Sequence, residues 1–473
     1  MAEREERPDR TLHFERRMSD AEALMWNLEK DPYLSASFAS LTILDQPPDF
    51  ERFRERMAMA VEAVPRLRQR VAPVLGRLAP PAWTDDPDFD LDYHVRRMGL
   101  PSPGTERQLY DLASLLSVDP FERSRPLWSF VIIEGLEGGR AALFQKMHHT
   151  VTDGEGGIRM SEQFIDISPD AEEPIIKRKM PAPTRDTPTN VVSAAVETAG
   201  HAARRQLGVA RRGIGEAAGL VTSPARIPRV GIDAVETARS LLRQMAVTDS
   251  ARSPLWTTRS LRRRFETLQV PFDDARRAAK ALGGTLNDLF VTGAAGGAGA
   301  YHRAKGTEID ELRMAMPVST RTDRSAGGNA FTPTRVLVPA GVVDPVERFN
   351  AVRERLTRTK GERAIGMVEG MAGLINTLPT QLLVRFARQQ VETVDFATSN
   401  VRAAPFDLYI GGAKIVVNYP MGPTGGTAFN VTVMSYAGSL DMGVNIDTAA
   451  VDAPDLLRAC LQESFEELVA AGS

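Results

Sequence analysis

The chain has 473 residues, more than the roughly 250 to 300 at which a single hydrophobic core stops growing, so the sequence predicts two domains or subdomains. Hydrophobic residues make up 42% and charged residues 25%, which is ordinary for a soluble globular protein, and the net charge of −3 gives no global reason to expect nucleic acid. The single cysteine, Cys460, excludes an internal disulfide framework and a multi-cysteine zinc site, in keeping with a reducing compartment.

Neither a secretory signal nor a membrane span is predicted. The N-terminal stretch "MAEREERPDR" is charged and has no apolar core. The longest weakly polar stretch, Leu289 to Tyr301, is far shorter than the ~20 residues that cross a bilayer. We therefore expect a cytoplasmic protein whose membrane contact, if any, is peripheral.

The first part of the chain alternates helix and strand. A short helix is predicted within residues 18–31, a strand within 35–45 and an amphipathic helix over 47–71. Residues 125–151 then predict two strands joined at the turn sequence Glu137-Gly138-Gly139-Arg140, which is typical of a hairpin.

The composition changes between about Pro169 and Ser260. Proline and charged residues come first and indicate a linker. Between His201 and Arg264 there are thirteen arginines, no lysine and four acidic residues, so this segment is basic by about nine charges. It is interpreted either as a solvated helical connector or as an interfacial patch for anionic lipid head groups or acyl-carrier phosphates.

A second α/β part is predicted from residue 261 onward. Thr285 followed by Asp288 has the form of a capping box at the start of a helix. Four glycines in that helix each cost roughly 1 kcal/mol of helix propensity against alanine, which close packing or a tunnel wall would explain and a loop would avoid. Further helices are predicted over 271–284, 344–360 and the C-terminus, where Cys460 is interpreted as a buried hydrophobe, and strands over 311–320, 331–341, 412–420, 428–438 and 440–448.

The sequence "MHHTVTDGEGG" places two adjacent histidines at the end of a predicted strand. Successive strand residues point to opposite faces, so His148 and His149 should diverge, and a shared metal ion is not expected. One neutral imidazole could remove a proton from a bound alcohol, with the glycines after Asp153 forming a sharp turn. Two satisfied, buried histidines beside a turn are the structural alternative.

The pattern His148-His149-x-x-x-Asp153-Gly154 resembles the active-site motif of the acyltransferases related to chloramphenicol acetyltransferase. Within that superfamily, Pro126-Leu127-Trp128 and Asn287-Asp288 are similar to motifs of the bacterial wax ester synthase/diacylglycerol acyltransferase family. Residues 316–329 and 429–447 resemble further stretches of the same family. The likeness runs from about Met18 to the C-terminus.

This resemblance implies an α/β fold of two chloramphenicol-acetyltransferase-like subdomains, each a mixed sheet flanked by helices, over residues 1–168 and 261–473, joined by a long crossover linker over 169–260. It implies transfer of a long-chain acyl group from acyl-CoA, as co-substrate and without another cofactor, to diacylglycerol or a fatty alcohol. Association with the inner face of the membrane or with lipid droplets is also expected.

The resemblance assigns roles to individual residues. His149 is the expected general base, with His148 supporting the site and Asp153 shaping the loop. Gly154 and Asn287 are expected at the substrate; Asn287 follows a predicted N-cap, where free N–H groups favour a developing oxyanion or a phosphate. Asp288 is expected to serve the cap.

One stretch departs from the family. "SNVRAAPF" keeps Asn400 and Val401 but lacks the family's Pro-Gly-Pro turn, which bears on acceptor specificity. Two other functions remain open from the sequence: a condensation-type enzyme with a carrier-protein donor, and a non-catalytic lipid-binding or lipid-droplet scaffold.

Overall fold

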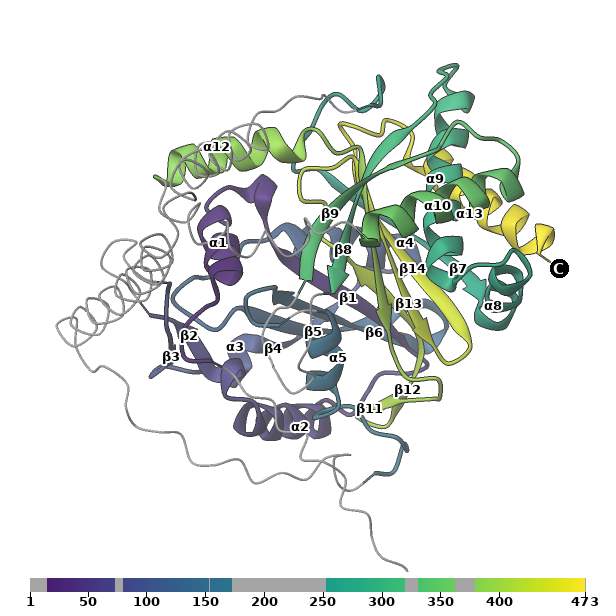
Figure 1. Cartoon of the computed structure of the whole chain (residues 1–473). Coiled ribbons are helices and arrows are strands. Elements are labelled where there is room, and N and C mark those ends of the chain that lie inside the picture. The colour runs from purple at the N-terminus through teal and green to yellow at the C-terminus, as the bar shows by residue number, and fades with distance from the viewer. Residues whose placement is uncertain are drawn as a thin grey trace, which may run out of the picture.

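The computed structural model describes residues 15–72, 80–152, 154–171, 252–319, 331–361 and 379–472. Within these ranges, two six-stranded sheets each carry their own helices (Figure 1). Both sheets combine parallel and antiparallel strand pairs. The mixed α/β fold with two sheet-containing domains predicted from the sequence is therefore confirmed.

The first domain is built on a sheet with the strand order β11-β12-β1-β6-β5-β4. Its N-terminal elements are α1 (Asp20–Leu28), η1 (Pro32–Leu34), β1 (Ser37–Leu44), α2 (Phe50–Ala63), η2 (Pro65–Arg68), β2 (Gln69–Val71), β3 (Trp83–Asp85), α3 (Leu91–His94), β4 (Val95–Gly99), α4 (Glu106–Val118), β5 (Trp128–Leu136), η3 (Glu137–Gly139), β6 (Arg140–His148) and α5 (Gly154–Ser161).

The predicted hairpin is formed by β5 and β6, and within the sheet β6 pairs with β1 while β5 pairs with the edge strand β4. Gly138 and Gly139 adopt φ angles of 75° and 72° at the turn of the hairpin, in the left-handed region that glycine enters without a Cβ clash. By contrast, the helix predicted over 47–71 is too long. It ends at Ala63, because Pro65 has no N–H to continue the hydrogen-bond ladder, and the chain continues as η2 and β2.

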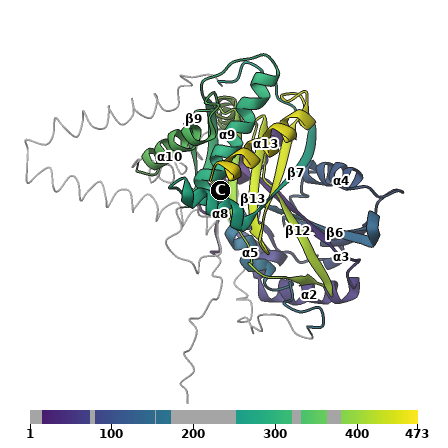
Figure 2. The same ribbon diagram turned by 90° about the vertical axis from the view of Figure 1, so that its right-hand side faces the viewer.

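The second domain is built on a sheet with the order β7-β14-β13-β10-β8-β9. Figure 2 shows its helices α8, α9, α10 and α13 on one side of this sheet and the first domain on the other. The elements of the C-terminal half are β7 (Arg263–Pro271), α8 (Phe272–Ala281), α9 (Leu286–Ala304), β8 (Leu312–Ser319), β9 (Phe331–Val338), α10 (Pro345–Gly361), α12 (Thr380–Val391), β10 (Phe396–Arg402), β11 (Tyr409–Ile410), β12 (Ala413–Met421), β13 (Phe429–Tyr436), β14 (Ser439–Asp447) and α13 (Pro454–Ala471).

The glycine-rich segment after Thr285 is a helix, and its glycines are sites of close packing rather than a loop. A Cβ on Gly293 would lie 2.2 Å from the Phe465 ring of α13. A Cβ on Gly299 would lie 1.9 Å from the carbonyl oxygen of Ala340. Small residues let these elements approach, and the lost helix propensity is offset by packing.

Two strands from the C-terminal half, β11 and β12, complete the first sheet. β12 pairs antiparallel with β1, with Leu41 opposite Tyr419, and β11 pairs with β12. The chain therefore crosses back into the first domain after residue 402, an exchange that the residue ranges drawn from the sequence did not include. β12 also contacts β13 and β14, so it links the two sheets.

Candidate functional site

The two histidines of the motif lie where β6 ends. The N–H of His148 donates to the carbonyl of Leu127, and the N–H of His149 donates to the carbonyl of Ala36 at 3.1 Å. In the register of β1 and β6, His148 is opposite Ser37 and Met147 is opposite Phe38. His149 lies just beyond the end of β6, and its ring contacts Phe38, whereas His148 approaches Glu29. The two imidazoles therefore diverge, as predicted.

His148 is buried, with 1% of its surface exposed. Its Nδ1 accepts the backbone N–H of Thr150 at 3.1 Å and lies 2.8 Å from the Thr150 hydroxyl. The proton of the neutral ring is therefore placed on Nε2. That nitrogen lies 3.2 Å from the Glu29 carboxylate in an electrostatic contact.

His149 is half-buried and is the more accessible of the pair. Its ring packs against Phe38 with a centroid separation of 4.6 Å and an interplanar angle of 35°. Phe38 also contacts the position that a Cβ on Gly157 would occupy. The His149 ring thus packs against Phe38 of β1, and Phe38 in turn lies close to Gly157 of α5.

The glycine-rich segment after the histidines differs from the sharp turn predicted from sequence. Residues from His149 to Val151 form the turn, and Gly154 already begins the helix α5. Gly157 has no positive φ, so the glycines serve a helical turn close to Phe38 rather than a left-handed return. Asp153 lies outside the described residues, and its role in the loop stays a prediction.

The Pro-Leu-Trp motif supports the histidine pair from β5. The Leu127 carbonyl accepts the N–H of His148 at 3.0 Å. Trp128 is 1% exposed, lies opposite Met147 in the sheet and donates from its indole to the carbonyl of Leu67 at 2.7 Å. The motif therefore fixes the end of β6 from the side opposite β1.

Asn287 is half-buried in the first turn of α9, two residues after the N-cap Thr285. Asp288 accepts from the N–H and the hydroxyl of Thr285 at 2.8 Å each, which confirms the predicted capping role. Asn287 is thus free of the cap, at the positive end of a 19-residue helix dipole.

The departing stretch is placed next to Asn287. The side-chain amide of Asn400, on β10, donates to the side-chain oxygen of Asn287 at 3.5 Å, a long hydrogen bond. β10 contacts both α9 and α5, the helix that follows the motif. The fold therefore brings the two asparagines and the motif segment around one strand.

Glu29 was missed by the sequence reasoning. It is the C-cap residue of α1, where the helix dipole disfavours a negative charge. It accepts hydrogen bonds from the N–H of Ala36 and the hydroxyl of Ser35 at 2.7 Å each. The one sequence signal for Glu29 was a negative charge near the C-terminal end of a predicted helix, where the dipole disfavours it.

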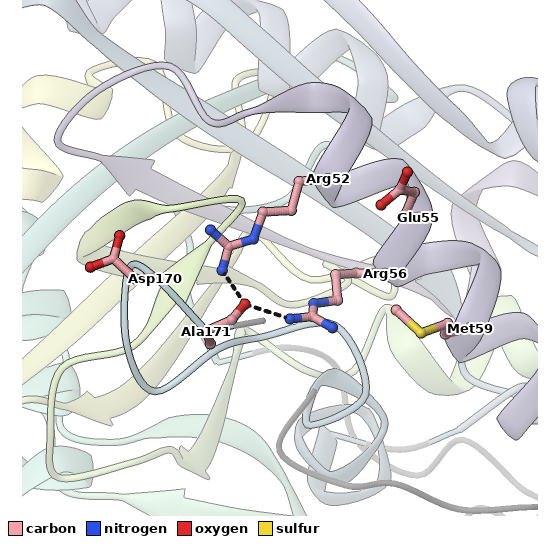
Figure 3. Close-up of a pocket in the computed structure, with 6 residues that line it drawn as sticks. All are labelled: Arg52, Glu55, Arg56, Met59, Asp170 and Ala171. Atoms are coloured by element: carbon pink, nitrogen blue, oxygen red, sulfur yellow. Dashed lines mark hydrogen bonds between the residues drawn. The ribbon is translucent and has the colours of Figure 1, made fainter. Parts of the chain in front are cut away.

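A pocket of about 550 Å³ lies elsewhere on the first domain (Figure 3). Arg52 and Arg56 of α2 both donate to the carbonyl of Ala171 and contact the buried Asp166, so their charge is compensated. The other lining side chains include the acidic Glu55 and Asp170. This pocket carries none of the predicted site residues and is not the candidate site.

The described residues contain no group of three or more histidine, cysteine or acidic side chains arranged to hold a metal ion. Among the helices in the same part of the chain, none is long and apolar enough to cross a bilayer.

Comparison with known families and proteins gives consistent matches over nearly the whole chain. Residues 18–290 match the wax ester synthase/diacylglycerol acyltransferase catalytic domain, and residues 327–469 match the C-terminal domain of the same family. Two proteins of Mycobacterium tuberculosis that are named diacylglycerol O-acyltransferases are 35% and 29% identical to it. The first match covers 94% of this chain and 90% of the relative; the second covers 96% and 97%.

Solved structures share the fold. The wax ester synthase/diacylglycerol acyltransferase from Marinobacter aquaeolei matches with a TM-score of 0.63 and 21% identity, over 96% of this chain and 99% of that one. The first condensation domain of the calcium-dependent antibiotic synthetase matches with a TM-score of 0.57 and 16% identity, over 96% and 95%. The starter condensation domain of rhizomide synthetase, solved with C8-CoA, matches with a TM-score of 0.53 and 13% identity, over 96% and 94%.

Proposed function

Because the chain belongs to the wax ester synthase/diacylglycerol acyltransferase family and is an acyltransferase, we propose that it moves a long-chain acyl group from acyl-CoA to the hydroxyl of diacylglycerol or a fatty alcohol. The observation that carries this proposal is the position of His149. It is the accessible imidazole of the motif, held at the end of β6 by the backbone and beside Phe38.

The proposed reaction is a direct transfer. His149 removes the hydroxyl proton of the acceptor while the acceptor oxygen bonds to the thioester carbonyl carbon. The tetrahedral intermediate then collapses, the carbon–sulfur bond breaks, and the leaving thiolate takes the proton from the imidazolium to give free CoA and the ester. No further cofactor is needed, since every proton and electron pair is supplied by the two substrates and His149.

Asn287 is proposed to stabilise the developing oxyanion or to bind the donor. Its place in the first turn of α9 supports this role, because backbone N–H groups there have no intrahelical partner. The motif residues Asp153 and Gly154 are proposed to shape the loop between His149 and α5.

We predict that His149→Ala loses activity by on the order of 10²- to 10⁴-fold, the usual contribution of a positioned general base. Purified variants are incubated with a long-chain acyl-CoA and an acceptor, and free CoA is measured. A folded His149→Ala protein with near-normal turnover would contradict the assignment.

The acceptor class is decided by a panel at fixed acyl-CoA. Diacylglycerol and fatty alcohols of several lengths are compared by the rate of CoA release and by the ester formed. Asn400→Ala, next to Asn287, is included because the departing stretch is proposed to influence acceptor choice.

A carrier-protein donor is the second candidate, since the sequence leaves a condensation-type enzyme open. Acyl-CoA and acyl-carrier protein are compared as donors with the same acceptor. Faster transfer from the carrier would replace CoA in the proposal and leave the role of His149 unchanged.

We further propose that the protein works at a lipid surface, because both proposed substrates are lipids. The basic segment that was predicted to mediate this contact spans His201 to Arg264, and eight of its thirteen arginines lie outside the described residues. Among the five that are described, Arg263 pairs with Asp447 and Arg264 with Glu266, so these two charges are compensated within the second domain.

A further inference from the structure

We propose that Glu29 is a positioning residue for the candidate general base. It fixes the imidazole of His148 and the backbone that carries His149, without itself touching a substrate. This inference rests on the proposed role of His149 in the transfer reaction.

Glu29 joins the two strands that hold His149. Its carboxylate accepts the N–H of Ala36 at 2.7 Å, while the carbonyl of the same Ala36 accepts the N–H of His149 at 3.1 Å. The single residue Ala36 thus connects the carboxylate to the backbone of the base through its N–H and its carbonyl. The start of β1 is further held by the hydroxyl of Ser35, which donates to the other carboxylate oxygen at 2.7 Å.

The second connection runs through the side chain of His148. Thr150 occupies Nδ1, so the N–H of the neutral ring is on Nε2, 3.2 Å from Glu29. The contact does not have hydrogen-bond geometry, but the negative charge of the carboxylate favours the tautomer whose N–H faces it and restrains the ring electrostatically. Since His148 immediately precedes His149, a change in the ring of one shifts the backbone of the other.

The place of Glu29 in its own helix favours a role outside that helix. A negative charge at a helix C-terminus is disfavoured by the helix dipole. Burial raises the pKa of the carboxyl, but the contacts with His148 and Ala36 outweigh it and lower the pKa of Glu29 below its usual value. Glu29 is therefore held as a carboxylate by the site residues themselves.

Two further cations face Glu29, and both are engaged elsewhere. Lys146 on β6 is buried and donates to the carbonyl of Leu116 at 3.0 Å. Arg123, which follows α4, donates to the carbonyl of Trp26 at 3.0 Å and lies over its ring. His148 is the partner in direct contact with the carboxylate, and the other two act over a longer range.

The test is a graded series at position 29. Glu29→Gln removes the charge but can still accept from Ala36 and donate to Ser35, whereas Glu29→Ala removes both contacts. We expect kcat to fall roughly 10-fold in the first and roughly 100-fold in the second, the scale seen when a carboxylate that orients a histidine is lost, with KM within about 2-fold. Glu29→Asp, which keeps the charge, should recover part of the lost kcat.

The matched control is Glu134→Gln, which removes an ion-paired carboxylate from the far end of β5 in the same sheet. It should leave kcat and KM unchanged. Thermal unfolding of every variant is followed to separate loss of activity from loss of fold.

A second readout does not depend on activity. The nitrogen spectra of the six imidazoles should show His148 protonated on Nε2, and its signals should move in Glu29→Gln but not in Glu134→Gln. If Glu29→Gln kept a normal kcat and unmoved His148 signals, the inference about Glu29 would be overturned. The base assignment would still stand in that case, provided that His149→Ala was inactive. An active His149→Ala would instead remove the base assignment, and with it the role of Glu29 in catalysis.

Discussion

At the scale of single residues, the buried His94 makes the stability of the first domain depend on pH. It packs against Trp128 of the Pro-Leu-Trp motif. His94 is fully buried between the rings of Phe89 and Trp128, with centroid separations of 5.3 Å and 4.5 Å. Its Nδ1 donates to the carbonyl of Trp128 at 2.8 Å. Burial lowers the pKa of His94 from 6.5 to about 4.

This lowered pKa predicts acid sensitivity. In the unfolded chain His94 binds a proton below pH 6.5, whereas in the folded chain it stays neutral until about pH 4. The stability present above pH 6.5 is therefore lost as the pH falls from 6.5 toward 4. The loss reaches up to about 3 kcal/mol. The free energy of unfolding in urea is measured between pH 7 and pH 4.5 for the wild type and for His94→Phe.

The variant should show a shallower decline over that window, although its stability at neutral pH is lower because the Trp128 carbonyl loses a donor. Parallel curves for the two proteins would show that another group governs the acid response.

At the scale of elements, α9 is the helix that positions Asn287, and its glycine face is what allows it to pack. Gly296 and Gly297 approach Ser464 and Leu461 of α13, and Gly299 approaches the backbone at Ala340. The capping box at Thr285 fixes where the helix begins. The first turn of α9 is therefore set by a local signal, while its depth in the domain is set by packing.

We predict that Gly299→Ala destabilises the protein by about 1–3 kcal/mol, despite the better helix propensity of alanine, because overpacking forces backbone shifts. The new Cβ would lie 1.9 Å from a backbone oxygen, which cannot rotate away as a side chain can. The free energy of unfolding is measured in urea.

Gly99→Ala is the matched control. Gly99 ends β4 and has nothing within 4 Å of its Cβ position, so its replacement should change stability by no more than about 0.5 kcal/mol. Equal effects of the two substitutions would show that the contact at Ala340 is relieved without cost.

At the scale of the whole molecule, the two domains contact each other through several elements. α12 of the second domain lies beside α1 (Figure 1), and Arg388 forms an ion pair with Asp31, two residues after Glu29. On another side, Arg107 of α4 pairs with Glu266 of β7 at 2.6 Å. The proposed site residues come from both domains, His148 and His149 from the first and Asn287 from the second.

The proposed membrane association is also tested on the whole molecule. We predict that the protein co-sediments with vesicles containing anionic lipid and that binding falls as salt is raised, because salt screens the attraction of the arginine-rich segment. Replacing Arg204, Arg205, Arg211 and Arg212 by Gln should weaken this binding.

Replacing Arg276 and Arg277 by Gln is the matched control, since these exposed arginines of α8 are already paired with Asp273 and Asp274. Binding that ignores salt and lipid charge would remove the electrostatic part of the prediction.

The sequence by itself determined the features that depend on short range. The period of two placed His148 and His149 on opposite sides, the Glu137–Arg140 turn predicted the hairpin, and Thr285 with Asp288 marked the start of α9. Each follows from backbone geometry or from a hydrogen bond within a few residues. The family motifs likewise identified an acyltransferase of the wax ester synthase/diacylglycerol acyltransferase type.

Only the tertiary structure decided the features that depend on distant contacts. Glu29 and His148 are far apart in sequence, so no local pattern shows that they touch. The insertion of β12 beside β1 requires the chain to return from the second domain, and Asn400 meets Asn287 only because β10 passes α9. Local periodicity predicts which face of a strand or helix a side chain lies on. Which residue it contacts there depends on how the whole chain packs.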